Sequence, residues 1–224
     1  MAAKLEGGCV VTGFREGEPR RDGALTVWDH FRGDRVSLRV LDVDGAASLR
    51  NEAGEEVLYV IEGSGGVNGT SVGADTAIYL PPGTELHLDG KMTLVSTICV
   101  GQTDSSAGQT GMSGPHIVSL AERPMQRTGD RSYRELIQQE VTQFVGAIPP
   151  GRAPNHHHLY EEVICILAGE GRMWAGETNT PVGVGSCIYL PRKQTHCLEN
   201  TGSGELRLLG VFYPAGSPAV RYTS

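Results

Sequence analysis

Residues 155–171 read NHHHLYEEVICILAGEG, with three consecutive histidines placed just before two glutamates and an apolar run. A similar stretch without the histidines occurs earlier in the chain. There, GEEVLYVIEGSG (54–65) aligns with YEEVICILAGEG (160–171) at an offset of 106 residues. Self-similarity of this kind predicts a repeated structural unit.

The match extends on both sides of these two segments. Upstream, Gly45 falls on Gly151 at the same offset of 106. Downstream, AIYLPPGTELHL from Ala77 matches CIYLPRKQTHCL from Cys187 at an offset of 110, so the second copy carries four additional residues. We therefore predict that the chain is a tandem duplication.

The boundary between the copies is predicted from composition. Residues 101–115 read GQTDSSAGQTGMSGP, a segment with almost no apolar content that is typical of a linker. We therefore expect an N-terminal domain over residues 1–100, a linker over 101–115 and a C-terminal domain over 116–224.

The pattern within each copy favours an all-β fold. Short apolar runs alternate with Gly, Pro, Asn and Asp, and glycine is abundant at 31 of 224 residues. Only RSYRELIQQ (131–139) has the spacing of a helical turn. Each copy is therefore expected to form a small β-barrel or sandwich whose mouth can hold a ligand.

Charge and cysteine content exclude several classes of protein. The chain has 19 Lys and Arg against 26 Asp and Glu, a net charge of −7, and no long basic run, which argues against nucleic acid as a partner. No apolar segment is long enough for a signal peptide or a membrane span, so we expect a cytoplasmic protein without a membrane partner. Five cysteines without CxxC spacing suggest reduced thiols.

The histidine cluster has the composition of a metal site. On a strand His156 and His158 face the same way and Glu162 shares their parity, whereas Glu161 points away. His196, which follows Pro191, is a fourth donor from a neighbouring strand. Three imidazoles and a carboxylate suit Fe, Mn, Ni, Co or Zn as a divalent ion, and six-coordination leaves two open positions.

These residues resemble the two motifs of the cupin superfamily, and the duplication resembles a bicupin. The first motif is matched by His156, His158, Glu162 and Gly169, and the second by Gly185, Pro191, His196 and Asn200. The resemblance implies two tandem jelly-roll β-barrels and assigns His156, His158, Glu162 and His196 as metal ligands. Lys193 departs from the family, which usually has glycine in that turn, and Gly185 lies one residue closer to the proline than usual.

The first copy lacks most of these ligands. By the alignment Arg50 replaces His156, Glu52 replaces His158 and Leu86 replaces His196, so only Glu56 is retained. The neighbouring His87 is one position out of register, which reverses the face on a strand. We therefore expect one metal ion per chain, in the C-terminal barrel, and a structural role for the N-terminal barrel.

Other residues near the motifs are candidates for supporting roles. Tyr160 and Asn200 could orient a ligand or meet the substrate, or serve only in packing and a turn hydrogen bond. A looser set of arginines could bind a carboxylate, or lie on the solvated surface: Arg127, Arg131, Arg134 and Arg152.

The predicted function is a metal-dependent enzyme acting on a small oxygen-rich metabolite, most simply a non-haem dioxygenase-type oxidoreductase, because no dedicated base is evident. The alternatives are a Lewis-acid isomerase, lyase or hydrolase, including the bicupin aminohydrolase of ureide breakdown, and a non-enzymatic sugar or organic-acid binding protein. We also expect a homodimer, because VVTGF (10–14) and HIVSL (116–120) precede each barrel and could pair outside their own copy.

Overall fold

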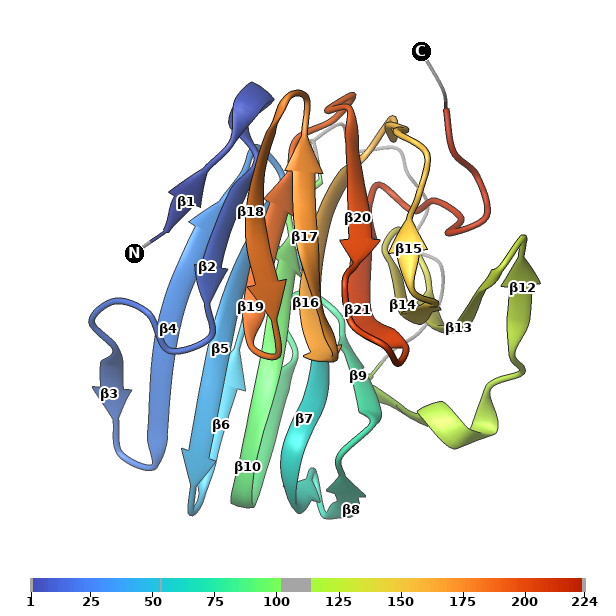
Figure 1. Ribbon diagram of the computed structural model, residues 1–224. Coiled ribbons are helices and arrows are strands. Elements are labelled where there is room, and N and C mark those ends of the chain that lie inside the picture. Colours follow the sequence, from blue (N-terminus) through green and yellow to red (C-terminus); the bar gives the residue numbers. More distant parts are fainter. Residues whose placement is uncertain (1, 53, 102–113, 223–224) are drawn as a thin grey trace. The chain divides into compact units, whose positions relative to one another are not determined.

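The computed structural model describes residues 2–52, 54–101 and 114–222, and these form strands joined by turns (Figure 1). The predicted all-β class is confirmed. In the described ranges no helix has the length and apolar character needed to cross a membrane. Two short 3-10 turns interrupt the strands, η1 (Glu6–Gly8) and η2 (Leu120–Glu122).

The chain divides into two compact units. We call residues 17–122 the N-terminal barrel, and residues 1–16 together with 123–224 the C-terminal barrel. Most of the predicted linker, residues 102–113, lies outside the described residues. The expected boundaries were 1–100 and 116–224. Residues 1–16 instead belong to the C-terminal barrel, and residues 116–122 belong to the N-terminal barrel.

The N-terminal barrel is built on one sheet of order β11-β9-β7-β10-β5-β4-β3, in which β6 pairs with β10 and β8 with β7. Its strands are β3 (Arg20–Asp22), β4 (Leu25–Arg32), β5 (Val36–Asp44), β6 (Ala47–Arg50), β7 (Glu55–Val67), β8 (Thr70–Gly73), β9 (Thr76–Leu80), β10 (Glu85–Cys99) and β11 (His116–Ser119). The long strands β7 and β10 carry the sheet around an interior filled by side chains such as Leu58, Ile78 and Leu94.

The C-terminal barrel has two sheets around one apolar core. The larger sheet has the order β1-β2-β19-β16-β21-β14-β13-β12, and the smaller has the order β15-β20-β17-β18. The strands of the larger sheet are β1 (Ala3–Lys4), β2 (Val10–Gly13), β12 (Gln126–Thr128), β13 (Arg131–Gln138), β14 (Thr142–Ile148), β16 (Glu161–Ala168), β19 (Ser186–Leu190) and β21 (Leu206–Tyr213). Those of the smaller sheet are β15 (Gly151–Arg152), β17 (Glu170–Ala175), β18 (Thr178–Gly183) and β20 (His196–Asn200).

Equivalent turns in the two barrels carry the same backbone conformation, as a duplication requires. Gly63 and Gly169, 106 residues apart, have φ values of +81° and +83°. Gly45 and Gly151 have φ values of +119° and +126°. These left-handed conformations favour glycine because it has no Cβ. The aligned glycines are therefore retained for the same physical reason in both copies.

The strands that precede each barrel pair outside their own copy, within the same chain. β2 pairs with β19, joining Val11 to Ile188 and Thr12 to Cys187. β11 pairs with β9 in the N-terminal barrel. Because each strand completes the other barrel's sheet, residues 1–16 pack with the second copy and residues 116–122 with the first. The homodimer stays a prediction.

The expected helical turn at 131–139 is wrong, because this segment forms β13. Its buried residues Tyr133, Leu136 and Ile137 have the spacing of a helix face. A β-bulge between Glu135 and Ile137 shifts the register against β14 and produces this spacing in a strand.

Replacing Val11 by alanine tests the assignment of β2 to the C-terminal barrel. Val11 is 6% exposed and belongs to the core of that barrel. We expect a loss of about 1–3 kcal/mol in the free energy of unfolding, because the substitution removes buried methyl groups. Hydrogen exchange should increase in β19 and not in β5. Val184, which is 70% exposed, provides the control substitution to alanine, and faster exchange confined to β5 would contradict the assignment.

Candidate metal centre

Backbone pairing brings the histidine segment to β20. His156 and His196 form an antiparallel bridge in which the His156 N–H donates to the His196 carbonyl at 3.0 Å and the His196 N–H donates back at 2.8 Å. The His158 carbonyl accepts from the backbone N–H of Lys193 at 2.7 Å. Two segments about 40 residues apart in sequence are thus locked together at the point where their imidazoles meet.

Three imidazoles and one carboxylate converge inside the C-terminal barrel. His156, His158 and His196 offer ring nitrogens that lie within 4.8 Å of one another. Oε2 of Glu162 lies 3.6 Å from Nε2 of His158 and 3.5 Å from Nε2 of His196. All four side chains are buried. The structure therefore brings together the four residues that the motifs select.

The arrangement fits a divalent transition ion. Donors about 2.1 Å from one ion, at octahedral or tetrahedral angles, are about 3.0–3.4 Å apart, which is close to the separations from Glu162 to the two histidines. Oε2 of Glu162 is buried without a hydrogen-bond partner among the described residues. A buried carboxylate oxygen in that condition is costly unless a cation lies beside it. An ion held by these four donors removes that cost.

Backbone carbonyls set the orientation of two of the rings. Nδ1 of His156 lies 3.1 Å from the Pro154 carbonyl, and Nδ1 of His196 lies 2.8 Å from the Gln194 carbonyl. Because a carbonyl only accepts, each Nδ1 carries the proton, and Nε2 keeps its lone pair for a metal. The ring of His158 is instead held by stacking on Tyr160, with centroids 4.9 Å apart and planes 12° apart.

Burial sets the protonation states that metal binding requires. Burial, assisted by neighbouring His196, lowers the pKa of His156 to about 3. Burial likewise lowers the pKa of His158. For Glu162 burial acts in the opposite direction, but the three histidines beside it outweigh this effect and lower its pKa. Neutral imidazoles and an ionised carboxylate are the forms that bind a metal.

Lys193 has the left-handed backbone conformation that glycine usually adopts in this turn. Its φ is +62°, and the aligned Gly83 of the first copy has φ of +72°. The backbone N–H of Lys193 donates to the carbonyl of His158, and that of Gly83 donates to the carbonyl of Asn51. The turn therefore keeps its shape, at the cost of holding a side chain in the left-handed region.

A pocket opens above the ligand quartet. His156, His158, Glu162 and His196 line it, together with apolar residues of the barrel wall such as Phe144, Ile148 and Leu198. Thr128, Ser132, Arg131 and Arg221 add polar groups. The cavity volume is about 80 Å³, against roughly 10–15 Å³ for a cavity that holds one water. The pocket therefore has room for a small molecule.

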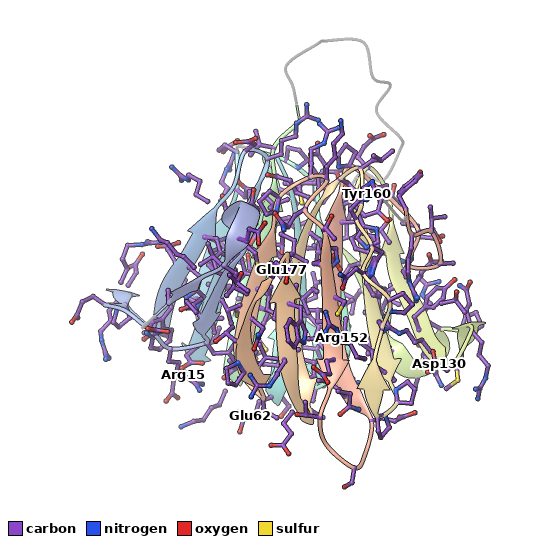
Figure 2. All side chains as sticks on the ribbon, turned by 45° about the horizontal axis from the view of Figure 1, so that its top comes forward. Arg15, Glu62, Asp130, Arg152, Tyr160 and Glu177 are labelled. Atoms are coloured by element: carbon purple, nitrogen blue, oxygen red, sulfur yellow. The ribbon has the colours of Figure 1, made fainter. Side chains whose placement is uncertain are left out.

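Tyr160 and Asn200 lie outside the pocket lining. The Tyr160 hydroxyl donates to the Ser217 carbonyl at 3.3 Å, and Figure 2 labels this residue. Burial, with the charge of Glu162, raises its pKa, so the phenol stays protonated. The Asn200 amide donates to the carbonyls of Ile148 and Gly204, at 2.8 and 2.7 Å. Tyr160 therefore supports the ring of His158 by stacking, and Asn200 stabilises the turn that ends at Gly204.

Of the four candidate arginines only Arg131 lines the pocket. Arg134 donates to the Arg123 carbonyl, and Arg152, labelled in Figure 2, lies over the ring of Trp174 at 4.0 Å. Arg221, which also lines the pocket, was missed by the sequence analysis. It lies beyond the last repeated segment, where the alignment of the two copies provides no signal.

In the N-terminal barrel the retained glutamate, Glu56, is bound by other side chains instead of lying in a histidine cluster. Glu56 is fully buried, and its Oε1 accepts from Arg39 at 2.6 Å and from Ser96. Leu86, which aligns with His196, belongs to the apolar core. Arg50 and Glu52 pair with each other on the surface. The guanidinium of Arg39 thus neutralises Glu56, whereas the equivalent Glu162 of the other barrel faces His158 and His196.

Known proteins share this fold, as a family match and a structural superposition show. Residues 144–212 match the profile of the family described as Cupin domain. A mutant of Bacillus subtilis oxalate decarboxylase superposes with a TM-score of 0.72 at 15% identity, over 92% of this chain and 78% of that chain. The fold is that of the cupins. The predicted pair of tandem jelly-roll barrels is confirmed, and membership of the cupin superfamily is supported.

Three further comparisons differ in extent. A Pseudomonas aeruginosa protein described as glyoxylate-induced superposes with a TM-score of 0.77 at 13% identity, over 97% of this chain and 93% of that one. Auxin-binding protein 1 of Arabidopsis thaliana is 31% identical over 32% of this chain, and the match spans 41% of that relative, less than half its length. Another structure of the Bacillus subtilis oxalate decarboxylase, at 14% identity, is described by its Mn(II) centres.

Removing one ligand tests the metal centre. Replacing His158 by alanine should weaken metal binding by more than about 100-fold, because loss of an outer hydrogen-bond partner alone costs roughly 10–100-fold. Elemental analysis of untagged protein should give one transition ion per chain for the wild type and little for the variant. His87→Ala, in the N-terminal barrel, is the control. Two tightly held ions per wild-type chain would contradict the single site.

Restoring glycine in the second-motif turn should stabilise the protein. Lys193→Gly relieves a left-handed conformation worth about 1–2 kcal/mol, offset by about 0.5–1 kcal/mol of added freedom in the unfolded chain. Denaturant unfolding should therefore show a gain of about 0.5–1 kcal/mol with unchanged metal content. Lys193→Ala keeps the same backbone demand and should show no gain; an equal gain in both variants would count against the explanation.

Proposed function

We propose that this chain is a metal-dependent bicupin enzyme acting on a small oxygen-rich metabolite. His156, His158, Glu162 and His196 would hold one divalent transition ion in the C-terminal barrel, and the N-terminal barrel would hold none. The observation that carries the proposal is the buried quartet at the base of a pocket, in which Oε2 of Glu162 has no hydrogen-bond partner among the described residues.

Within this class we favour a dioxygenase-type oxidoreductase. Among the described lining residues, Glu162 is the only carboxylate, and the histidines are the ligand set itself. The Tyr133 hydroxyl donates to Gln126 at 3.0 Å, and Glu161, outside the pocket lining, accepts from Tyr189 at 2.5 Å. A dedicated base is thus missing from this part of the chain. A divalent ion supplies Lewis-acid polarisation of an oxygen-donor substrate and, in the case of iron, reactivity toward dioxygen.

The protein's own residues would position the substrate and restrict water. Phe144 and Phe212 lie 4.8 Å apart between ring centroids and form part of the apolar wall. An apolar wall strengthens electrostatic interactions at the base of the pocket because it excludes water. The four side chains line the pocket, so a substrate would approach a bound ion from it.

A Lewis-acid lyase, isomerase or hydrolase is the second candidate. It is favoured by the structural likeness to oxalate decarboxylase, a protein described with Mn(II) centres. At 14–15% identity this likeness concerns the fold, so it supports the choice of chemistry only by analogy. A non-enzymatic protein that binds a sugar or organic acid would use the same pocket without turnover.

We further propose that the protein works as a homodimer in the cytoplasm, with a small molecule as its partner and neither nucleic acid nor a membrane. β1 and β12 are the end strands of the larger sheet in the C-terminal barrel. End strands present backbone groups that a second copy can pair with. Light scattering that gives the mass of one chain, 23.9 kDa, would contradict the dimer.

Dependence on oxygen and on the metal tests the reaction class. The Fe(II)-loaded protein should consume oxygen with one of a panel of catechols, diketones, flavonols and small acids, measured with an oxygen electrode, and should be inactive anaerobically. The Zn(II)- and Mn(II)-loaded forms should turn over at least about 100-fold more slowly, because they do not supply the same redox chemistry. His158→Ala should abolish the signal. Equal turnover without oxygen, or with Zn(II), would assign the Lewis-acid reaction instead.

A further inference from the structure

Two arginines line the same pocket as the candidate metal centre. Arg131 begins β13 directly after a two-residue turn, whose Asp130 is labelled in Figure 2, and Arg221 lies in the segment that follows β21. Both side chains line the pocket and are half-buried. Neither guanidinium group has a side-chain hydrogen bond or a close ion pair with a described residue, although the charge of Asp130 acts on Arg131. Half-buried guanidinium groups with open N–H donors can bind an anion that enters the pocket.

The electrostatics of the pocket also favour an anion. Burial lowers the pKa of Arg131, and the positive charge of Arg221 lowers it further, while the neighbouring Asp130 acts in the opposite direction. Two like charges therefore influence each other at the same pocket. The single carboxylate among the described lining residues is Glu162, which already faces two of the histidines. The pocket thus has excess positive charge away from its ligand quartet.

The middle histidine of the triplet helps place Arg221. His157 and Tyr222 form a backbone bridge with hydrogen bonds of 2.9 and 3.2 Å, and their rings stack at 5.7 Å. The segment is also fixed at Gly216, whose carbonyl accepts from the Thr142 hydroxyl at 2.8 Å. Arg221 is next to the bridged Tyr222. His157 is therefore a positioning residue between two histidines of the ligand set.

We propose that Arg131 and Arg221 form a carboxylate-binding subsite, so that the substrate of this pocket is a small organic anion with one carboxylate on the arginines and an oxygen donor facing the ligand quartet. The inference rests on the proposed function, because the anion is taken to be the substrate of the metal site. Guanidinium groups bind carboxylates through paired N–H donors. The cavity volume of about 80 Å³ favours a compact anion such as a dicarboxylate or a hydroxy or oxo acid.

Direct binding of a simple probe tests the subsite without any turnover. Calorimetric titration of the Mn(II)-loaded protein with sodium malonate should show binding that malonamide, the neutral diamide of the same skeleton, does not reproduce. Arg131→Gln and Arg221→Gln should each weaken malonate binding by roughly 10- to 100-fold, the usual effect of losing a hydrogen bond to a charged group. Arg172→Gln is the matched control, because Arg172 contacts Asn179 and does not line the pocket.

Two additional variants separate a binding role from a structural one. Arg221→Lys keeps the charge but loses the paired donors, so its malonate affinity should lie between those of the wild type and Arg221→Gln. Tyr222→Ala should weaken malonate binding less than Arg221→Gln does, because the backbone bridge to His157 remains. Metal content, measured by elemental analysis, should be unchanged in both variants.

The outcomes distinguish this inference from the proposed enzyme. Arginine-dependent malonate binding that persists after chelation of the metal supports the subsite even if no reaction is found. Malonate affinity that is unchanged in the double variant Arg131→Gln, Arg221→Gln would overturn it. So would malonamide binding as tightly as malonate, or arginine-dependent binding of inorganic phosphate without binding of malonate.

Discussion

A buried carboxylate is the constraint on which both barrels depend. Glu56 and Glu162 occupy equivalent positions in the two copies, and each must be matched by positive charge or by donors because ionised groups are costly in an apolar interior. In the first copy Arg39 and Ser96 bind Glu56 directly. In the second copy Glu162 lies beside His158 and His196, which cluster with His156. The same buried glutamate is therefore neutralised by an arginine in one half and lies in a cluster of histidines in the other.

Strand pairing shows how this divergence became possible. Glu56 pairs with Ile98 on β10 and Glu162 with Phe212 on β21, so Ser96 corresponds to Gly210. Across the next strand Ser96 pairs with Arg39, and Gly210 pairs with Phe144. Gly210 leaves room for the Phe144 ring, since a Cβ there would lie 2.3 Å from it. A polar pair in one barrel therefore corresponds to an aromatic wall in the other, and that wall lines the pocket.

The triplet of histidines combines two tasks that alternate along the chain. His156 and His158 face inward to the ligand cluster, whereas His157 pairs with Tyr222 of the C-terminal segment. The same short stretch therefore contributes two histidines of the candidate metal centre and fixes the segment that carries Arg221. Tyr160 also contacts both the histidine cluster and the C-terminal segment, because its ring stacks on His158 and its hydroxyl donates to the Ser217 carbonyl. Ligand geometry and the polar rim of the pocket are thus built by one stretch of residues.

The sequence by itself determined the features that depend on local spacing. The duplication, the β class and the quartet of His156, His158, Glu162 and His196 follow from repeats, short apolar runs and motif spacing. The expected single strand is not formed, because His156 and His158 precede β16. The match between Gly83 and Lys193 likewise located a turn whose conformation both copies share.

Only the tertiary structure decided which distant segments meet. The exchange of β2 and β11 between copies depends on which sheet edge each strand completes, and nothing within VVTG or HIVS specifies that edge. The bulge that makes residues 131–138 a strand comes from pairing with β14. The Arg39–Glu56 contact likewise depends on strand pairing. The sequence alignment places Arg39 on Val145, whereas the pairing of the strands makes it equivalent to Phe144. Arg221 reaches the pocket through backbone hydrogen bonds to His157, a long-range pairing that leaves no periodic trace in the sequence.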